Sequence, residues 1–399
     1  MRWLILFGLW AAYMTFGAVA SSLAPLVPII QADLNISYSE MGSILGSWQV
    51  IYIFSAIPAG VLLDRIGAKS ALLIGLGLII ASAFGRAISE NYLMLMASVM
   101  LFGLGGPIIS SGAPKVVTNL FNGNERGLAM GIYMTGPILG GIACLTLTHS
   151  ILLPTLGNDW RNVMLLWSGL TGLISIIWIL ISSLPGTNLP GLKTMEPISH
   201  DEHADFTTTI RKIIKDPAVK LLLLMAIGAF SINHGLNNWL PAILRDHGRS
   251  LIDASYWAAL PMVIGIFSSL IIPRLATPQR RFKILVGLCI SAALAALALV
   301  GSGDTSLLIS LVMQGFVRAS LMTVLILTLM ELPSIKTSEA GTASGLFFSA
   351  AEIGGVLGPL SLGILYDFTG DFSAGLYGIT AVATLMALGS IKLGKRNKA

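Results

Sequence analysis

Charged residues are scarce in this sequence: 11% of its positions are Asp, Glu, Lys or Arg, against about 25% in a soluble globular domain. Only two cysteines are present, Cys144 and Cys289. They lie inside apolar runs in different halves of the chain, so we expect ordinary packing rather than a disulfide or redox chemistry. The GxxxxGK[ST] phosphate-binding loop is missing from the sequence, so ATP-driven pumping is not indicated. These shortages point away from soluble enzymes.

Apolar residues are plentiful instead. They make up 55% of the chain and form twelve long stretches, each of about 20 residues and therefore able to cross a hydrocarbon core roughly 30 Å thick. The stretches are uniformly apolar rather than alternating, which indicates helices and not strands. The sequence therefore predicts an all-α membrane protein with spans near 4–28, 39–62, 70–89, 92–119, 127–153, 161–184, 218–243, 254–276, 282–301, 305–331, 339–366 and 372–391.

Lysine and arginine are distributed unevenly between the two sets of span ends. Arg86, Arg161, Arg245 and Arg249 lie at one set, and the other bases outside the spans lie at the opposite set. Because basic loops stay in the cytoplasm, both termini are predicted to be cytoplasmic in a multi-pass protein of the cytoplasmic membrane. This bias also accounts for the net charge of +5, so no nucleic-acid partner is expected. The basic, apolar start resembles a signal peptide, but its apolar run continues to Pro28, and we expect it to be the first helix.

The composition changes in the middle of the chain, where residues 185–217 contain prolines, acids and bases but no spanning run. We therefore expect an N-terminal six-helix bundle over 1–184, a cytoplasmic linker over 185–217 and a C-terminal six-helix bundle over 218–399. Phe206, Ile210, Ile213 and Ile214 recur at helical spacing near the end of the linker. This spacing predicts a short amphipathic helix on the membrane surface.

The two halves also resemble each other in sequence. The segment ERGLAMGIYMTGPILGG from Glu125 aligns without a gap with EAGTASGLFFSAAEIGG from Glu339, and six residues coincide. Within one residue, the same shift pairs LVPIIQAD near 26 with LPAILRD near 240, and Phe54-Ser55 with Phe267-Ser268. Such repeats are common in transporters, whose substrate site lies at the interface between the repeats. The pattern favours a duplicated six-helix unit.

Two short motifs connect the chain to a known family. GVLLDRIGAK, residues 60–69, resembles the GxxxDRxGxK signature of the major facilitator superfamily, and GIYMTGPILGG resembles its Gly-Pro antiporter-type motif through Gly136, Pro137, Gly140 and Gly141. The segments NNWLPAILRDHG and GPLSLGILYDFTG resemble cyanate-permease-like and related anion transporters of that superfamily. The resemblance covers essentially the whole chain. It implies two pseudo-symmetric six-helix bundles that give a central site access to each side of the membrane in turn.

The first motif supplies a predicted conformational latch, formed by Gly60, Asp64, Arg65, Gly67 and Lys69. The glycines permit close backbone approach and a tight turn, Asp64 can cap a helix or pair with a base, and Arg65 and Lys69 stay in water. In relatives resembling this chain, the latch holds the two bundles together. Plain positive-inside anchoring explains the two bases but not Asp64. The corresponding turn in the second half, PRLATPQRRFK, has lost the Asp and the glycines.

Ionisable residues deep inside the spans are the main functional candidates, because each costs several kcal/mol unless it pairs or faces water. Arg318 lies in the span 305–331 with Gln314 one turn earlier. Its planar fork of donors suits a carboxylate or another small oxyanion, so we expect it to anchor an anionic solute. The alternative is a structural salt bridge to Glu352, and the two roles are compatible. Glu352 is the candidate proton-coupling site, because burial penalises its charged form.

Further candidates come from other spans. Lys115 either snorkels to the surface or faces inward as a second positive charge for the solute. The amide-rich segment SINHGLNNWLP serves as polar glue between helices or as a cavity wall. In the superfamily the first, fourth, seventh and tenth helices line the cavity. The remaining predicted substrate-binding residues are Asn233, His234, Asn237, Tyr13, Gln49, Tyr52 and Tyr133.

The predicted function is secondary active transport of a small organic or inorganic anion by alternating access, with proton-coupled symport as one option. Expected partners are the solute, the lipid bilayer and protons, and the protein is expected to be a monomer without cofactor or metal. The rivals are a drug or metabolite efflux antiporter and a non-transporting membrane sensor of the same fold. A drug-proton antiporter is disfavoured because MLFGLGG lacks the Arg found in many such relatives. A metal site at His200 and His203 would be the basis of an enzyme, but the linker offers no second cluster.

Overall fold

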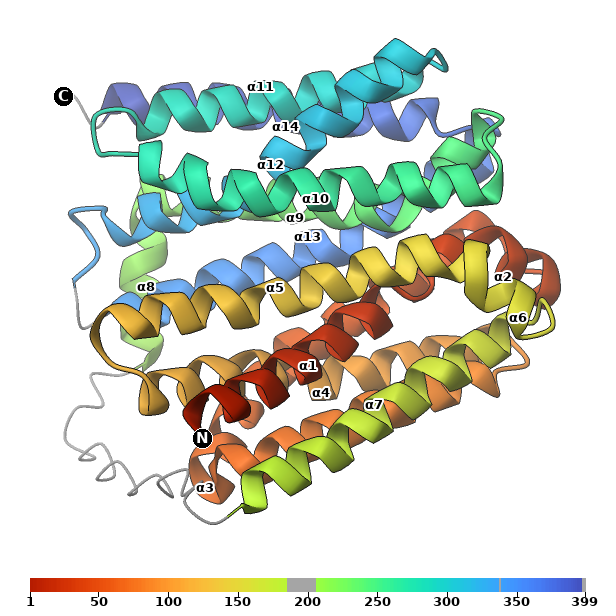
Figure 1. Cartoon of the computed structure of the whole chain (residues 1–399). Helices are drawn as coiled ribbons and strands as arrows, with labels where there is room; N and C mark the ends of the chain where they lie inside the picture. Colours follow the sequence, from red (N-terminus) through yellow and green to blue (C-terminus); the bar gives the residue numbers. More distant parts are fainter. Residues whose placement is uncertain (185–205, 337–338, 397–399) are drawn as a thin grey trace. The chain divides into compact units, whose positions relative to one another are not determined.

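The computed structural model describes residues 1–184, 206–336 and 339–396, and all regular elements in these ranges are helical (Figure 1). The prediction of an all-α membrane protein is therefore confirmed. The helices are α1 (Arg2–Ser21), η1 (Ala24–Leu26), α2 (Val27–Leu34), α3 (Tyr38–Ala87), α4 (Tyr92–Leu120), α5 (Gly123–Leu147), η2 (Thr148–Leu152), α6 (Leu153–Thr155), α7 (Trp160–Ser183), α8 (Phe206–Lys215), α9 (Pro217–Asp246), α10 (Leu251–Leu275), α11 (Arg281–Val300), α12 (Asp304–Met330), α13 (Ala340–Thr369) and α14 (Ser373–Arg396).

Eleven helical segments in the described residues are long and apolar enough to cross a membrane. One of them, α3, is two helices joined across Gly67, whose backbone is non-helical with φ +78°. A side chain rarely adopts this conformation, whereas glycine does so without steric cost. Dividing α3 at Gly67 gives the twelve spans that the sequence predicts, with the two spans near 39–62 and 70–89 on either side of the kink.

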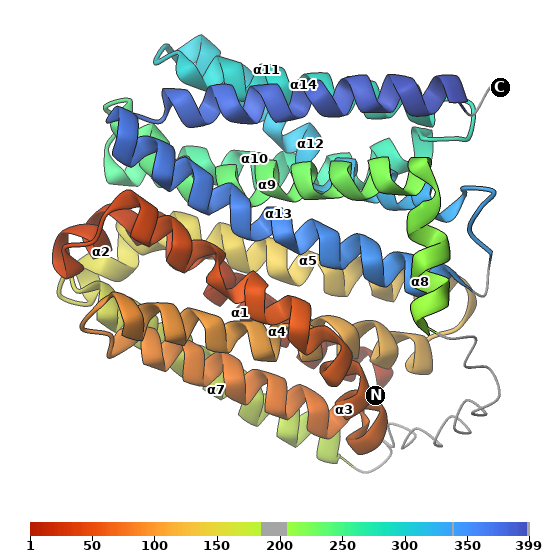
Figure 2. The same ribbon diagram turned by 180° about the vertical axis from the view of Figure 1, so that it is seen from behind.

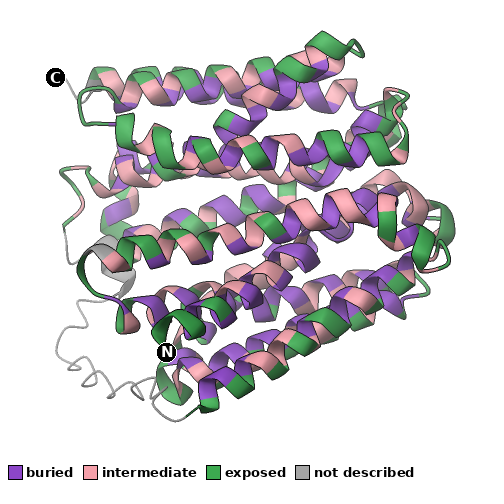
Figure 3. Cartoon of the chain, viewed as in Figure 1, coloured by how far each residue is buried: buried purple, intermediate pink, exposed green. Residues whose placement is uncertain are grey.

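The exposed faces of the spanning helices are apolar rather than polar. On α7, for example, Leu165, Leu173 and Ile176 are between 42% and 56% exposed. Figure 3 shows exposed and buried residues alternating along α7 and α11. In water, such large apolar areas would promote association, whereas in a bilayer they meet acyl chains at no cost.

Contacts divide the chain into two compact units, which are described separately. Unit 1 comprises residues 1–36, 47–199 and 251–256, and unit 2 comprises residues 37–46, 200–250 and 257–399. Each unit is built around one close helix crossing, α1 on α5 in unit 1 and α9 on α13 in unit 2. A Cβ atom on Gly140 would lie 1.9 Å from the Met14 carbonyl oxygen, and one on Gly354 would lie 1.9 Å from the Ile227 oxygen. Small residues thus allow the same backbone approach in both units.

Polar contacts repeat between the units as well. Ser55 on α3 donates to the Gly103 carbonyl at 2.7 Å, and Ser268 on α10 donates to the Gly315 carbonyl at 3.0 Å. Ser55 and Ser268 are residues that the sequence repeat pairs with each other. A duplicated six-helix unit predicts such equivalent bonds, because a buried hydroxyl needs a partner in each copy.

A second contact involves Glu125 and Glu339, which the sequence repeat pairs with each other. Arg2 forms an ion pair with Glu125 at 2.9 Å in unit 1, and Lys212 forms one with Glu339 at 2.5 Å in unit 2. The hydrogen bond from Lys212 lowers the pKa of the Glu339 carboxyl. The repeat matches the two glutamates but not their partners, because Arg2 lies on α1 whereas Lys212 lies on α8, before α9.

Some helix boundaries differ from the predicted spans. The first helix is not continuous to residue 28, because α1 ends at Ser21 and the chain continues through η1 into α2. Pro25 lies at the start of η1 and lacks the N–H that an uninterrupted helix requires. The amphipathic helix predicted near 206–214 is confirmed as α8. The linker part 185–205, with His200 and His203, lies outside the described residues.

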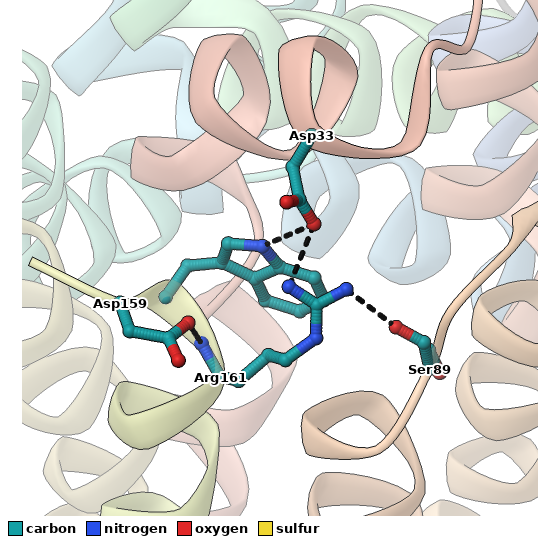
Figure 4. A network of polar contacts seen from close by, with 5 residues as sticks. Asp33, Ser89, Asp159 and Arg161 are labelled. Carbon is teal, nitrogen blue, oxygen red and sulfur yellow. Dashed lines mark hydrogen bonds and ion pairs between the residues drawn. The ribbon is translucent and has the colours of Figure 1, made fainter.

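A polar network closes the end of unit 1 at which α2 ends and α7 begins (Figure 4). Asp33 accepts hydrogen bonds from Trp160 Nε1 at 3.1 Å and from Arg161 Nη1 at 2.7 Å, and Arg161 Nη2 donates to the Ser89 carbonyl at 2.9 Å. Asp159 accepts the backbone N–H of Arg161 and so caps α7. Arg161 thereby joins α2, α7 and the segment after α3.

Candidate functional site

Arg318 on α12 is the centre of a polar cluster within unit 2. Its Nη1 donates to the Asn237 side-chain oxygen on α9 at 2.7 Å, and Asn233 Nδ2 donates to the Arg318 carbonyl at 3.0 Å. Asn233 and Asn237 are one helical turn apart and therefore share a face of α9. The structure thus brings together three residues that the sequence nominates for the same site.

These residues line a pocket formed by α9, α10, α11 and α12, which we call the Arg318 pocket. Its polar side chains are Asn233, Asn237, Gln314 and Arg318, and the others that line it are apolar. Gln314 is 8% exposed and donates to Ser310 Oγ at 3.0 Å. The pocket volume is about 30 Å³, which exceeds the roughly 10–15 Å³ that one buried water molecule needs. It therefore has room for a small polar group beside Arg318.

No ion pair in the described part of the chain joins Arg318 to Glu352. The Arg318 guanidinium is instead held by the neutral amide of Asn237. Glu352 on α13 is 7% exposed, and its Oε2 atom has no hydrogen-bond partner there. The predicted salt bridge is absent from this conformation, so the positive charge of Arg318 is not neutralised by that carboxylate.

His234 differs from its neighbours on α9. It is not among the residues that line the Arg318 pocket. Its ring lies 5.1 Å from the Phe230 ring, centroid to centroid, and its carbonyl oxygen accepts a hydrogen bond from Asn238 Nδ2 at 2.9 Å. His234 therefore belongs to the packing around the pocket rather than to its lining.

The candidates of unit 1 form a separate, largely aromatic group. Tyr13 on α1 and Tyr133 on α5 are both buried, and their rings meet edge to face with centroids 5.3 Å apart. Tyr52 on α3 shares a 2.7 Å hydrogen bond with Ser110 Oγ on α4, and Gln49 is fully buried one turn earlier. Edge-to-face packing stabilises aromatic pairs by about 0.5–1.5 kcal/mol. In the structure these side chains pack against one another. The sequence alone does not show whether they pack or bind solute.

Lys115 has the first of the two arrangements that the sequence leaves open. Its ammonium group forms an ion pair with Asp64 of the latch, so it does not offer a free positive charge to a solute in this conformation. Lys115 lies near the end of α4 and its side chain is only 22% exposed. A buried lysine stem with its charge held at the helix end is the snorkelling arrangement. The sequence nominates both residues but does not indicate that they are partners.

The other latch residues have distinct local roles. Gly67 provides the positive φ at which α3 divides, and Lys69 Nζ donates to the Ser182 carbonyl at 3.0 Å and to Ser183 Oγ at 2.9 Å. Lys69 thereby satisfies one of the last carbonyl groups of α7 and complements the helix dipole. Arg65 is exposed. A Cβ atom on Gly60 would meet nothing within 4 Å, so the close approach expected there is absent from this conformation.

The helix-five motif has a clear packing role. A Cβ atom on Gly136 would lie 2.8 Å from the Trp10 carbonyl oxygen, and Pro137 approaches Gly17 so closely that a Cβ there would lie 2.1 Å from the Pro137 oxygen. Gly140 meets Met14 in the same way, and Gly141 is buried beside it. The motif therefore provides the surface of α5 on which α1 packs.

The structure also reveals a buried base that the sequence analysis places only at a helix end. Arg86 on α3 is 1% exposed, and its Nη1 donates to the Val19 carbonyl at 2.7 Å and to Ser22 Oγ at 2.9 Å. It thereby caps the end of α1, where the carbonyl groups lack helical partners. Its position inside the apolar run 70–89 is the signal that could have identified it.

Metal binding is not indicated in the part of the chain that the structure describes, where no three His, Cys, Asp or Glu side chains are grouped to hold an ion. The polar groups of the Arg318 pocket are one guanidinium and three amide side chains, surrounded by apolar walls. Such a set can offer hydrogen bonds and positive charge to an anionic group.

Comparisons with known proteins agree with the motifs. The model of the Major Facilitator Superfamily matches residues 9–359. The hexuronate transporter of Bacillus subtilis is 23% identical over 398 residues, covering 93% of this chain and 90% of the relative. A quinolone resistance transporter of Acinetobacter baumannii is 27% identical over 374 residues, covering 88% and 84%. A crystal structure of the nucleoside transporter NupG superposes with a TM-score of 0.81 at 12% identity, covering 98% of this chain and 99% of that one.

Proposed function

This chain belongs to the Major Facilitator Superfamily, and on that basis we propose that it is a secondary active transporter of a small anionic solute that works by alternating access. The observation that carries the proposal is the Arg318 guanidinium on a membrane-spanning helix, which lines a pocket and hydrogen-bonds only a neutral amide among the described residues. A charge at this depth costs several kcal/mol when it is not compensated. A negatively charged solute would supply the compensation.

The chemistry of the pocket narrows the solute class. Guanidinium donors match carboxylates and other oxyanions in geometry. The amide groups of Asn233, Asn237 and Gln314 can each donate or accept further hydrogen bonds. The hexuronate transporter is named for a carboxylate solute, which fits this donor set. We therefore propose a small carboxylate or inorganic oxyanion, with Arg318 on its charged head.

Membrane placement completes the proposal. The excess of lysine and arginine at one set of span ends supports a multi-pass protein of the cytoplasmic membrane with both termini inside. The six-helix bundles are assigned to residues 1–184 and 218–399, with 185–217 as the cytoplasmic linker. We expect a monomer to be sufficient, because one chain contains both repeats.

Glu352 is the proposed site of proton coupling. It is buried, and its Oε2 atom has no partner among the described residues. A carboxylate in this setting is stabilised by taking up a proton, which gives the transporter a group that can bind and release one during its cycle. The role requires that Glu352 stays free of a permanent ion pair, and the absence of an ion pair to Glu352 among residues 1–184, 206–336 and 339–396 supports it.

The latch is proposed to control the conformational change. Its ion pair between Asp64 and Lys115 joins α3 to α4 beside the Gly67 kink, and Lys69 joins it to the end of α7. Exposed ion pairs contribute little to stability, so they can break and re-form without unfolding the unit. This makes them suitable for a step that is repeated in every transport cycle.

The decisive experiment measures counterflow in proteoliposomes with sugar acids, other small carboxylates and nitrate as probes. Wild-type protein should exchange at least one of them. Arg318→Ala should abolish the exchange, and Arg318→Lys should restore part of it, because the charge returns without the planar fork of donors. Thermal unfolding would verify that both variants are folded. Full exchange by a folded Arg318→Ala protein would refute the anion anchor.

The efflux of apolar drugs is a second candidate, supported by the similarity to the quinolone resistance transporter and by the helix-five motif. A transporter of cationic or apolar drugs has no need of Arg318, so its drug transport should survive Arg318→Ala. A sensor of the same fold would bind a solute but show no counterflow. The same set of assays therefore separates the three functions.

A further inference from the structure

We infer that unit 2 carries a binding site for an anionic phospholipid in a groove between α9 and α14, outside the Arg318 pocket. The two helices contact each other, and Figure 2 shows α9 beginning at the same end at which α14 finishes. The groove has a volume of about 400 Å³, within the range of pockets that hold small organic molecules.

The floor and walls of the groove are apolar. They are formed largely by Leu221, Leu224, Leu385 and Leu388, and the last three are 64%, 67% and 57% exposed. Gly389 leaves room for the Leu221 side chain at the base of the groove, because a Cβ atom there would lie only 3.3 Å from the Leu221 Cδ1 atom. On a membrane-spanning surface, such a hollow is filled by an acyl chain, which excludes water from the leucines.

Two lysines supply the charge that selects the ligand. Lys220 and Lys392 both line the groove and are exposed, and the residues that line it include no Asp or Glu. The described part of the chain provides no ion pair for either ammonium group. Nearby Asp216 accepts the backbone N–H of Ala218 at 2.8 Å and lines a neighbouring hollow instead.

The combination identifies the ligand class. An acyl chain requires an apolar hollow, a phosphate requires positive charge, and a phospholipid requires both at the boundary between lipid and water. Basic pockets between membrane helices bind anionic head groups for this reason. By the charge bias, this end of unit 2 faces the cytoplasmic leaflet. A phosphatidylglycerol-like lipid fits the groove better than a zwitterionic lipid, whose own cation would approach the lysines.

The simpler explanation is that Lys220 and Lys392 only anchor the chain at the membrane surface. A matched control separates the two explanations. Lys283 and Lys395 are also exposed bases of unit 2 and do not line the groove. The double variant Lys220→Gln/Lys392→Gln and the control Lys283→Gln/Lys395→Gln lose the same charge, and all four positions are on the surface, where such changes leave folding intact.

The test is native mass spectrometry of the full chain in detergent with equal amounts of phosphatidylglycerol and phosphatidylcholine. Wild-type protein should retain phosphatidylglycerol in preference to phosphatidylcholine. The groove variant should bind it about 30-fold more weakly, and the control variant should bind it like wild type. Gly389→Leu should also reduce retention, because its side chain fills the hollow while both lysines remain.

Three results would overturn the inference. Equal losses in the two double variants would mean that general surface charge, not the groove, attracts the lipid. Displacement of phosphatidylglycerol by glycerol phosphate at equal concentration would mean that the acyl chain contributes nothing. A dimer that the groove variant disrupts would mean that a second copy of the chain, rather than a lipid, covers this surface.

Discussion

The Arg318 guanidinium on α12 donates a 2.7 Å hydrogen bond to the side-chain oxygen of Asn237 on α9. Asn237 orients the guanidinium without neutralising it, because an amide carries no net charge. The contact joins two spanning helices of unit 2 at the wall of the Arg318 pocket. A movement of either helix would therefore change the position of the positive charge.

Replacing Asn237 with aspartate tests this arrangement directly. Asn237→Asp keeps the acceptor oxygen and adds a negative charge against Arg318, so the internal carboxylate should compete with the anionic solute. A charge-assisted hydrogen bond contributes about 1.5–3 kcal/mol, and its loss should raise the KM for anion uptake about 10- to 100-fold. Uptake kinetics in proteoliposomes provide the measurement. Asn238→Ala, at an adjacent position of α9 that does not line the pocket, serves as control, and an unchanged KM in Asn237→Asp would contradict the model.

Glu352→Gln should preserve the exchange of solute across the membrane but abolish its accumulation against a gradient. Glutamine has the shape of a protonated glutamate but cannot release a proton, so solute counterflow should persist while uptake driven by a pH gradient is lost. Counterflow and gradient-driven uptake are measured on the same vesicles. Glu90→Gln removes an exposed carboxylate and should leave both unchanged. If Glu352→Gln vesicles still accumulate solute in response to pH, Glu352 is not the coupling site.

The latch ion pair should affect turnover more than stability. Asp64→Asn or Lys115→Gln should slow transport, while the free energy of unfolding changes by less than about 1 kcal/mol, because Asp64 is 67% exposed. The exchanged pair, Asp64→Lys with Lys115→Asp, should recover part of the rate. Turnover numbers and thermal unfolding are recorded for each protein. Normal turnover in both single variants would show that the pair has no role in the transport cycle.

The close helix crossings predict that glycine-to-alanine substitutions lower the stability of the protein at the crossings but not elsewhere. Gly140→Ala and Gly354→Ala each place a Cβ atom against a backbone carbonyl, 1.9 Å away before relaxation, and overpacking of this kind costs about 1–3 kcal/mol. Both variants should have a lower Tm. Gly345→Ala, whose Cβ would meet nothing within 4 Å, should be neutral or stabilising by up to about 1 kcal/mol. Equal Tm values for the three variants would contradict the close packing of the helices at Gly140 and Gly354.

Glycine positions illustrate how far sequence reasoning extends. The repeat pairs Gly140 with Gly354, and the structure gives both the same contact with a carbonyl of the first helix in their unit. Gly60 and Gly67 belong to one motif, yet only Gly67 has a positive φ and only its replacement would strain the backbone. A motif records which residues occur together, but not which of them needs to be glycine in a given conformation.

Charged residues also show what sequence reasoning finds and what it misses. The sequence identifies Lys115, Arg318 and Glu352 as charges inside apolar spans, because hydropathy alone reveals them. Their partners are far away in the chain: Lys115 pairs with Asp64 on another helix, and Arg318 is held by Asn237. Sequence distance carries no information about such contacts, so the sequence leaves both roles of Lys115 open, whereas the structure shows its ion pair.

The sequence by itself determined the twelve apolar spans, the helical class, the repeat and the family. These properties depend on local composition and length, since any apolar run of about 20 residues satisfies its own backbone as a helix in lipid. Only the tertiary structure decided that Glu352 Oε2 has no hydrogen-bond partner among the described residues, that Arg86 donates to a carbonyl at the end of α1, and that Lys220 and Lys392 line one groove. Those features arise where helices distant in sequence pack together, and packing geometry is set by side chains from several helices at once.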